Sequence, residues 1–568
     1  MIKFRPKLFT LFRTYSVGQL VSDLGAGVIV GIVAMPIALA YAIASGVIPE
    51  AGLITAIIAG FLISLLGGSR VQIGGPAGAF IIIIYSIVEQ HGMDGLIITT
   101  FLAGIMLVIM GLLQMGSIIR FMPYPIVIGF TSAIAVIIFT TQLNAFFGLE
   151  VPDVSAKFLE KWKLFFQYLH TINPYAAGLG IITLLLVIIL PKLGSRIPGS
   201  FIAIILTTLL VYLFNLPVET LGSKYGEISS TIPKPSFPEF TFEKVSILIQ
   251  PAFTIAMLCA IESLLSAMVA DGFTGGSHRP NTELIAQGTA NMVVPLFGGI
   301  PASGQIAKTM TNIRRGAKTP VAGIIHAIVL LIIFMFLGKF AELIPMACMA
   351  GMLIGVAYKM SEWHTFVGFL RYPRSDGLVL ITTFLLTLVF DLTIALQVGL
   401  LMAMVSFLKR VAETSNIEVF RRDVNDESEP ETLFDQHLGN VKIPEGIEIY
   451  EIKGPLFFGV VNKFDEIVRE NTHDIFVRII RLRRVPFIDS TGLNNLENLY
   501  YKSIGEKIQL IFSGVHPGAL QALQQSGLLD KIGQENVFND IAPALLRAHE
   551  IVEAREKRKQ EKSRKHQK

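Results

Sequence analysis

Up to about residue 410, the sequence alternates between long apolar runs and short polar breaks. A helix that crosses a bilayer needs about 20 consecutive apolar residues. Long apolar runs begin near Gly25, Leu53, Leu96, Ile126, Ala177, Phe201, Leu248, Val321, Pro345, Leu378 and Thr393. Three shorter runs, broken by glycine or proline, lie at 73–88, 284–298 and 300–313. The pattern therefore predicts an all-α membrane domain with fourteen spans.

A different pattern begins after Lys409 and Arg410. Residues 411–440 contain "RRDVNDESEPETLFDQ" and form a predicted charged linker. In 441–552, the runs "GIEIYEIKG", "DIFVRIIRL" and "KIQLIFSG" alternate with helical stretches. Strands that alternate with helices indicate an α/β layer structure. We therefore expect a transmembrane domain over 24–410, followed by a soluble α/β domain.

Both ends of the chain carry basic segments. Residues 1–23 open with "MIKFRPKLFTLFRTYS", which predicts an amphipathic cytoplasmic helix lying on the membrane surface. Residues 553–568, "EAREKRKQEKSRKHQK", predict a disordered basic tail that contacts anionic lipid. Membrane lipid is therefore an expected partner at both ends.

Composition narrows the class of protein. The 568 residues are 52% hydrophobic and 16% charged, whereas soluble chains average about 25% charged residues. The net charge of +4 is too small to indicate nucleic acid as a partner. The 2 cysteines, Cys259 and Cys348, lie in apolar runs and form neither a disulfide framework nor a metal motif. A phosphate-binding loop for ATP is also missing. We expect a transporter rather than an enzyme, with no cofactor and no metal.

Basic residues in the loops predict the orientation. With the N-terminus in the cytoplasm and fourteen spans, the basic loop residues share the cytoplasmic side: Arg70, Arg120, Lys192, Arg196, Arg279, Arg314, Arg315, Lys318, Arg371, Arg374 and Lys409. Such a bias is typical of cytoplasmic loops. An even number of spans places both termini in the cytoplasm. We expect the protein in the inner membrane of a bacterial cell.

Two stretches interrupt the apolar pattern at corresponding places. The first is "GGSRVQIGGPAGAF", residues 67–80, and the second contains "GGIPASGQIAK", residues 298–308. If the chain consists of two halves of seven spans, each interruption lies in the third span of its half. Paired glycine- and proline-broken spans point to the binding site of a transporter. An odd number of spans per half implies that the halves are inverted relative to each other.

The interruptions predict an anion site. Irregular backbone at membrane depth is tolerated only where it packs in protein or lines a wet cavity. Half-helices that begin near Pro76 and near Pro301 would expose unpaired N–H groups at the positive ends of their dipoles. Such ends attract anions, and Gly74, Gly75 and Gly78 leave room for a ligand. The alternative is a pair of close glycine-rich helix crossings without a ligand.

Polar residues inside the spans carry the candidate chemistry. Glu262 lies among apolar residues, where carboxyl groups are rare and suit reversible protonation; a strut between helices is the alternative. Lys308 either neutralises the anion, pairs with Glu262 or extends toward the cytoplasm. Ser266 completes a cation or water site, or else bonds its own backbone. Tyr41 lines the anion cavity or fills a helix interface. We expect Asp271, Glu283 and Asn291 to act as loop caps and packing groups.

Four stretches closely resemble the sulfate-permease (SulP) family, bacterial relatives of the solute-carrier anion transporters that include pendrin and prestin. They are "MPIALAYAIASGVIPEAGL", "GGSRVQIGGPAGAF", "AIESLLSAMVADGFTGGSHRPNTELIAQGTAN" and "GGIPASGQIAKTMTNIRRGAKTP". The resemblance implies fourteen spans in a seven-plus-seven inverted repeat. It implies a core domain of spans 1–4 and 8–11, and a gate domain of spans 5–7 and 12–14. It also implies a homodimer that moves its substrate by an elevator motion.

The resemblance also implies the site residues. The anion would lie between two matching stretches, which consist of Pro76, Ala77, Gly78, Ala79 and Phe80, and of Gly304, Gln305, Ile306, Ala307 and Lys308. Family members commonly carry arginine where Lys308 stands, and Tyr41 matches a position often held by an aromatic residue. Glu262 and Ser266 look like the pair of the proton-coupled dicarboxylate members. Sodium–bicarbonate members carry aspartate and threonine there instead.

The C-terminal domain resembles a STAS domain. Its signature is "FIDSTGLNNL", in which Asp489 is positioned to cap the following helix. In anti-sigma factor antagonists, a hydroxyl of this loop is phosphorylated, which would correspond to Ser490 or Thr491. The loop is therefore a candidate regulatory site for a cytoplasmic protein partner. The alternative is a plain helix cap.

Together, these features predict a secondary active anion transporter. We expect proton-coupled symport of sulfate, bicarbonate or a C4-dicarboxylate. The alternatives are a sodium-coupled bicarbonate symporter, an uncoupled exchanger or channel, and a sensor whose membrane part reports to the STAS domain. The titratable Glu262 argues against the uncoupled alternative.

Overall fold

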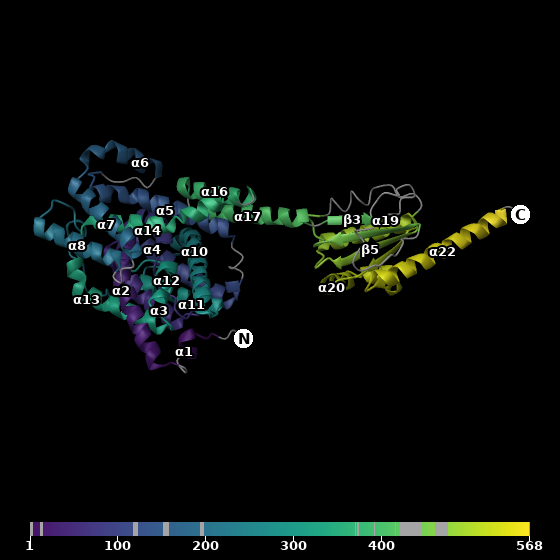
Figure 1. Cartoon of the computed structure of the whole chain (residues 1–568), viewed down its shortest axis with the longest axis horizontal. Helices are drawn as coiled ribbons and strands as arrows, with labels where there is room; N and C mark the ends of the chain where they lie inside the picture. Colours follow the sequence, from purple (N-terminus) through teal and green to yellow (C-terminus); the bar gives the residue numbers. More distant parts are fainter. Residues whose placement is uncertain are drawn as a thin grey trace. The chain divides into compact units, whose positions relative to one another are not determined.

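The computed structural model describes most of the chain (Figure 1). The ranges that it leaves undescribed are 1–3, 12–14, 118–122, 152–157, 194–197, 370, 372–373, 391, 415, 421–444, 461–474 and 567–568. The chain divides into two compact units, Met1–Ala403 and Met404–Lys568.

The first unit is helical. Among the described residues, 7 helices are long and apolar enough to cross a membrane. They belong to α2 (Val17–Ala44), α3 (Pro49–Leu66), α4 (Ile81–Leu112), α5 (Tyr124–Phe147), α7 (Pro174–Lys192), α10 (Phe242–Thr274) and α17 (Leu392–Thr414). The other helices are α1 (Lys7–Leu11), α6 (Phe158–Gln167), α8 (Gly199–Phe214), α9 (Leu221–Tyr225), α11 (Pro280–Val293), α12 (Ile306–Arg314), α13 (Val321–Ala341), α14 (Met346–Met360), α15 (Trp363–Phe369) and α16 (Arg374–Val389).

The apolar runs of the sequence coincide with these helices. Within α4, Gly92 leaves helical geometry with φ 66° and ψ −170°, and it separates the runs predicted as the third and fourth spans. The first unit is thus an integral membrane domain built from apolar helices. The count of fourteen crossings and the inverted repeat stay predictions.

The helices pack in two groups. In one group, α4 lies against α10 and α11, and α13 lies against α2 and α3. In the other group, α5 packs against α14 and α16, and α7 packs against α8 and α14. The division into a core and a gate domain stays a prediction.

Glycine allows the closest helix approach in the first group. A Cβ atom added to Gly104 of α4 would lie 2.7 Å from the carbonyl oxygen of Gly288 in α11. A Cβ atom added to Gly288 would lie 2.6 Å from the carbonyl oxygen of Gly104. Small residues let backbones touch in this way inside membranes. Any larger residue at this crossing would push α4 and α11 apart.

The predicted N-terminal segment, residues 1–23, has a different structure from the one expected. The described part holds the short helix α1, and the long helix α2 already begins at Val17. A capping box explains this start, because the Ser16 side chain accepts from the Gln19 N–H and the Gln19 side chain accepts from the Ser16 N–H. The last part of the predicted surface helix therefore belongs to the first long helix.

The second unit contains a sheet with the strand order β3-β4-β5-β6-β7. Strand β3 is antiparallel to β4, and the remaining pairs are parallel. The strands are β3 (Asn416–Phe420), β4 (Ile447–Lys453), β5 (Val477–Arg484), β6 (Gln509–Ser513) and β7 (Val537–Phe538). The helices are α19 (Ser490–Gly505), α20 (Pro517–Gln525), α21 (Leu528–Ile532) and α22 (Ile541–His566). The three strands predicted from the sequence are confirmed as β4, β5 and β6.

Alternating side chains build a core on each face of this sheet. On one face, Tyr450 and Ile480 pack in a cluster with Leu496 of α19. On the other face, Ile449 and Ile479 pack in a cluster with residues of α22. Side chains along a strand point alternately to its two sides. The sheet is therefore covered by helices on both faces, as expected for an α/β layer structure.

The structure bears on the predictions for the linker and for the C-terminal tail. Within the predicted linker 411–440, α17 continues to Thr414 and residues 416–420 form β3; the rest from 421 onward lies outside the described residues. The prediction of a disordered tail over 553–568 is wrong, because α22 continues to His566. The first turns of α22 are anchored on the sheet. Glu553 then lies 3.2 Å from His549 and 4.0 Å from Lys557, pairs that support a helix.

A buried ion pair joins two strands of this sheet. Glu448 of β4 stands opposite Arg478 of β5, with Oε2 and Nε 3.0 Å apart and both side chains 0% exposed. In the full-length protein, we expect Glu448→Gln to lower the free energy of unfolding of this unit by about 3 kcal/mol, because it strands a buried charge. Hydrogen exchange of the β4 and β5 amides in rising denaturant measures the change.

The control removes a partner from an exposed pair. Glu506→Gln breaks the contact with Lys502, and exposed pairs of this kind contribute little to stability. We expect this variant to exchange like the wild type. If Glu448→Gln also exchanged like the wild type, the stability of this unit would not depend on the charges of the buried pair.

Candidate functional site

The two interruptions of the apolar pattern meet as a pair of short strands. Strand β1 (Gly74–Pro76) lies antiparallel to β2 (Ala302–Gly304), with Gly75 opposite Ser303. All six residues of the pair are buried. Pairing satisfies backbone groups that would otherwise be costly at membrane depth. The broken stretches of the two halves therefore lie side by side inside the helical unit.

Helices begin directly after these strands. The 3-10 turn η2 (Gly78–Phe80) leads from β1 into α4, and Gln305 is the N-terminal cap residue of α12. The helix start predicted near Pro76 is confirmed, because η2 begins at Gly78. The start predicted near Pro301 is wrong, because Pro301 precedes β2 and α12 begins at Ile306. The Thr309 N–H is the first of α12 to bond backward, to the carbonyl oxygen of Gln305 at 2.9 Å. The earlier amides of α12 form a helix N-terminus next to the strand pair.

Side chains from neighbouring helices fix the backbone of β2. The Ile300 N–H donates to Thr55 Oγ1 at 2.7 Å, and the Gly304 N–H donates to Ser263 Oγ at 2.9 Å. Asn291 accepts from the Ala302 N–H at 2.9 Å and donates to the Ala302 carbonyl oxygen at 2.8 Å. The expectation that Asn291 is a packing polar group is confirmed. The extended backbone is therefore held by side chains of α3, α10 and α11.

Sequence reasoning missed Thr55 and Ser263. The available signals were a lone hydroxyl inside an apolar run for Thr55 and a position directly after Glu262 for Ser263. Hydroxyls in membrane helices most often bond their own backbone. Only the fold shows that Thr55 also accepts from the Ile300 N–H just before β2, and that Ser263 accepts from the Gly304 N–H of β2.

Glu262 and Tyr41 lie near this strand pair. The Ser303 hydroxyl of β2 donates to Glu262 Oε2 at 2.6 Å, and Glu262 itself is half-buried. Tyr41 of α2 is 7% exposed and lies close enough to Glu262 to sense its charge. A Cβ atom added to Gly78 would lie 3.3 Å from the Tyr41 ring and 2.9 Å from the sulfur of Met360. The fold therefore brings a carboxyl, a phenol and the start of η2 together.

Lys308 is buried rather than extended to the cytoplasm. It is 3% exposed, and its Nζ lies 3.4 Å from where a Cβ atom of Gly75 would stand. The interpretation that it extends outward is therefore wrong. Within the described residues, no ion pair joins it to Glu262, and Nζ has no hydrogen-bond partner. Its amine is therefore available to a ligand beside β1.

His326 is a buried group that sequence reasoning missed. It lies on α13, is 0% exposed, and neither ring nitrogen has a hydrogen-bond partner among the described residues. A Cβ atom added to Gly60 would lie 3.2 Å from its Nδ1 and 3.5 Å from the carbonyl oxygen of Gly74. The lone histidine in "VAGIIHAIVLL" was the available signal.

Ser266 bonds another helix rather than its own backbone, and its role in a cation or water site stays a prediction. Its hydroxyl donates to Thr309 Oγ1 at 3.2 Å, and the same Thr309 oxygen accepts from the Ile73 N–H at 3.0 Å. These bonds tie α10 to α12 and to the residue before β1. Ser266 therefore holds the broken segments together.

The remaining predicted site residues differ in exposure. Those around the first stretch are buried, namely Pro76, Ala77, Ala79 and Phe80. In the second stretch, Gln305 is 6% exposed and its Nε2 has no partner among the described residues, whereas Ile306 and Ala307 are exposed. The polar and charged members of the second stretch therefore point into the protein.

In the second unit, Asp489 caps α19. Its side chain accepts from the Gly492 N–H at 2.7 Å and from the Phe458 N–H at 3.1 Å. Ser490 is exposed and Thr491 is half-buried. The predicted cap is confirmed, and the hydroxyl of Ser490 stands at the surface of the loop.

Gly304 provides a direct test of the strand pair. A Cβ atom there would lie 1.5 Å from Gln72 Nε2, and Gln72 already donates to the Ser263 carbonyl oxygen at 2.9 Å. We expect Gly304→Ala to separate β1 from β2, to lower the thermal unfolding midpoint and to abolish transport. Size-exclusion chromatography and thermal unfolding of the purified protein measure the change. Gly178→Ala is the control, since nothing lies within 4 Å of its added Cβ. A Gly304→Ala variant with wild-type stability would contradict this geometry.

Known proteins resemble both parts of the chain. The sulfate permease family matches residues 20–383, and the STAS domain matches residues 440–544. A putative sulfate transporter of Bacillus subtilis, YvdB, is 39% identical over 93% of this chain and 98% of its own length. The bicarbonate transporter BicA of Picosynechococcus sp. is 26% identical over 93% of this chain and 94% of its own length.

Solved structures share the fold. The overall structure of SLC26A9 has a TM-score of 0.84 at 17% identity and covers 97% of this chain and 93% of its own. The transmembrane domain of a cyanobacterial BicA has a TM-score of 0.61 at 29% identity and covers 68% of this chain and 98% of its own. The chain, with its paired broken helices and its C-terminal α/β unit, belongs to the sulfate permease family and carries a STAS domain.

Proposed function

We propose that this protein is a proton-coupled symporter of a small anion. The observation that carries the proposal is the contact between Glu262 and Ser303, at 2.6 Å, on the strand pair that precedes the helix starts. A carboxyl group next to an anion site lets a proton and an anion bind close to each other. Binding of either then affects binding of the other.

Three features beside β1 and β2 support an anion as the substrate. The N-termini of η2 and α12 offer backbone N–H groups and positive dipole ends. Lys308 contributes a positive charge that has no partner among the described residues. Tyr41 and Gln305 add polar side-chain groups from α2 and from the loop before α12. Helix N-termini select a ligand by the sign of its charge more than by its shape.

The relatives narrow the choice of anion. Their names include sulfate and bicarbonate transporters. We propose sulfate, bicarbonate or a C4-dicarboxylate as substrate, because each presents oxygen atoms to N–H donors and carries a charge that Lys308 neutralises. The proposed substrate-binding residues are Tyr41, Pro76, Ala77, Gly78, Ala79, Phe80, Gly304, Gln305, Ile306, Ala307 and Lys308.

The hydroxyl groups around Glu262 favour protons over sodium as the coupling ion. A sodium site needs several oxygen ligands around one point. Ser266, the hydroxyl expected to help Glu262, donates to Thr309 instead. Within the described part of the chain, the hydrogen-bond partner of Glu262 is the single hydroxyl of Ser303. One carboxyl with one hydroxyl partner suits the gain and loss of a proton. Sodium-coupled bicarbonate symport is the alternative.

The two helix groups support an elevator motion. Glu262, Lys308 and both broken segments belong to the group of α2, α3, α4 and α10 to α13, whereas Met360 beside Gly78 belongs to α14 of the other group. We propose that the first group carries the anion past the second. We also propose that the protein forms homodimers in the inner membrane, with both termini in the cytoplasm.

In the STAS domain, phosphorylation of Ser490 or Thr491 would add charge at the start of α19 and control the binding of a protein partner.

Uptake into proteoliposomes tests the coupling. Labelled sulfate, bicarbonate, fumarate and succinate are offered under an imposed proton gradient or an imposed sodium gradient. We expect the proton gradient to drive uptake of at least one anion. Glu262→Gln should remove this dependence and leave only downhill exchange. Exposed Glu89→Gln is the control and should behave like the wild type.

Three results would contradict this assignment. Uptake driven by sodium alone would favour the alternative coupling ion. A Glu262→Gln variant that still follows the proton gradient would exclude Glu262 as the coupling group. Passive flux that ignores both gradients in the wild type would indicate an uncoupled exchanger or channel.

Lys308→Ala tests the positive charge beside β1. We expect anion affinity to fall about tenfold or more, because a charge-assisted contact of about 1.5–3 kcal/mol is lost. Isothermal titration with the transported anion measures the affinity, and thermal unfolding confirms that the fold is kept. Lys192→Ala at the exposed end of α7 is the matched control. Unchanged affinity in Lys308→Ala would exclude the amine from the binding site.

A further inference from the structure

A second basic group gathers around the loop between α3 and β1. The Lys7 N–H donates to the carbonyl oxygen of Gly67 at 2.9 Å, and the Arg279 N–H donates to the carbonyl oxygen of Gly68 at 3.0 Å. Arg70 lies two residues further along the same loop. Backbone bonds therefore bring three basic residues from distant parts of the sequence to one short loop.

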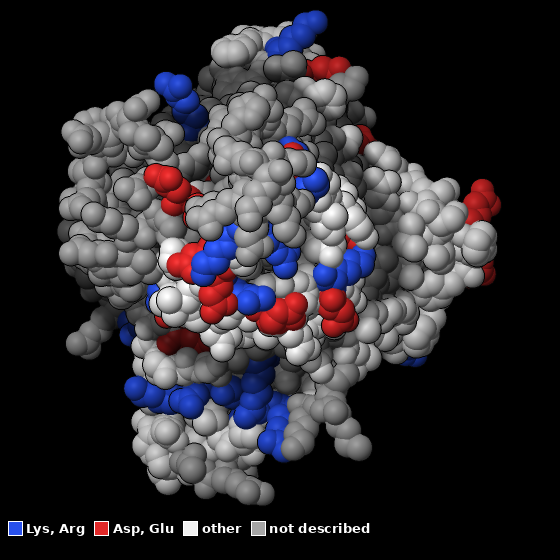
Figure 2. Space-filling model, turned by 90° about the vertical axis from the view of Figure 1, so that its right-hand side faces the viewer, with Lys and Arg blue, Asp and Glu red and all other residues white. Residues whose placement is uncertain are grey.

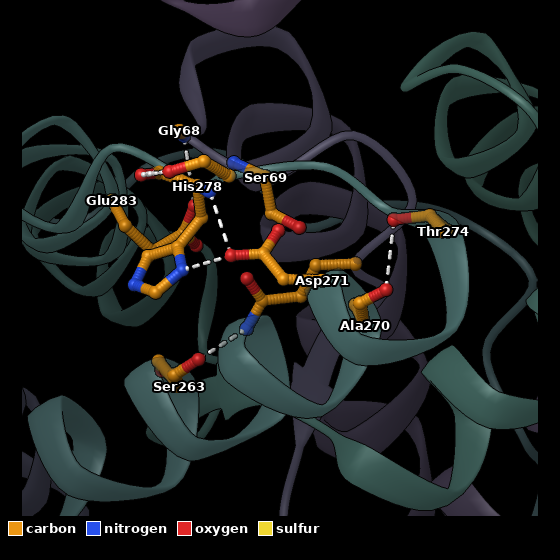
Figure 3. A network of polar contacts seen from close by, with 10 residues as sticks. Gly68, Ser69, Ser263, Ala270, Asp271, Thr274, His278 and Glu283 are labelled. Atoms are coloured by element: carbon orange, nitrogen blue, oxygen red, sulfur yellow. Dashed lines mark hydrogen bonds and ion pairs between the residues drawn. The ribbon is translucent and has the colours of Figure 1, made fainter.

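The nearest carboxylates are already occupied (Figure 3). Glu283 accepts from the N–H groups of Gly68 and Ser69, at 2.8 Å and 3.1 Å. Asp271 accepts from the N–H and from Nδ1 of His278, at 2.8 Å and 2.6 Å. The expectation that Asp271 and Glu283 cap loops is confirmed. These bonds also fix the backbone of the loop that lies next to the basic side chains.

The three basic side chains lack counter-charges. None of the ion pairs in the described ranges includes Lys7, Arg70 or Arg279. The Arg70 Nε atom is buried and has no hydrogen-bond partner. Burial lowers the pKa of Lys7, and the charges of Arg279 and Arg70 lower it further, against a smaller opposing effect of Asp271. Three like charges held together repel one another, so a bound anion would stabilise this arrangement.

Exposed aromatic residues flank the basic group. Phe4 and Phe9, on either side of Lys7, are 43% and 61% exposed. Figure 2 shows Lys and Arg side chains gathered low in the view. Aromatic and basic side chains on one short segment are typical of a segment that lies in the membrane interface. A soluble anion would use the basic group but not the aromatic rings.

We propose that Lys7, Arg70 and Arg279 bind the phosphate group of an anionic phospholipid. Arginine suits this ligand because its planar guanidinium matches a phosphate with paired N–H donors. Phe4 and Phe9 enter the adjacent acyl region. The bound lipid fastens α1 to the loop that leads into β1. Lipid composition then influences the stability of the segment next to the transport site.

Titration of phospholipid tests this site in the full-length protein. The protein is placed in nanodiscs of phosphatidylcholine with increasing phosphatidylglycerol, and native mass spectrometry counts the retained phosphatidylglycerol. We expect Arg70→Gln with Arg279→Gln to weaken retention about 30-fold, since each basic side chain near a membrane surface contributes a factor of about 5. The charge-keeping pair Arg70→Lys with Arg279→Lys should retain most of the binding.

A matched control removes the same charge elsewhere. Lys192→Gln with Arg371→Gln neutralises two exposed basic residues and should retain phosphatidylglycerol like the wild type. If the double glutamine variant does not stay folded, Lys7→Gln gives the same comparison, with an expected loss of about fivefold.

Two results would overturn the proposal. Equal retention of phosphatidylglycerol by the wild type and the glutamine variants would show that these side chains do not hold the lipid. Inorganic phosphate or sulfate that protects the protein against heat as well as phosphatidylglycerol does would identify a soluble oxyanion as the ligand.

Discussion

The central constraint of this structure is the need to satisfy broken backbone inside an apolar helical unit. Strands β1 and β2 meet this need by pairing with each other, and side chains of α3, α10 and α11 bond to β2 and the residues around it. Because the pair is antiparallel, η2 starts beyond one end of it and α12 starts beyond the other. Every feature of the proposed anion site depends on this arrangement, because the N–H groups, Glu262 and Lys308 are all positioned from it.

The membrane architecture and the location of the site follow from the sequence. Long apolar runs require helices, and paired glycine- and proline-rich interruptions stand out against them. Glu262 is recognisable because a carboxyl group is costly among apolar residues. The cap formed by Asp489 and the three strands of the STAS domain also follow from local patterns, since capping and alternation act over a few residues.

Other features depend on contacts between distant segments. Pro301 suggested a helix start, but β2 follows it and α12 begins only at Ile306. Ser266 bonds to Thr309, a choice that no local pattern reveals. The position of His326 beside β1 and the inward direction of Lys308 result from the packing of α3, α12 and α13, which local sequence does not show. At the tail, the sheet anchors α22, and a composition that suggests disorder continues as a helix.

Anomalous diffraction from crystals soaked in selenate, a heavier analogue of sulfate, would test the central claim most directly. The account predicts an anomalous peak beside β1 and β2, within hydrogen-bonding distance of the first amides of η2 or α12. A peak found only away from these helix starts, in crystals of a protein that binds selenate in solution, would contradict it.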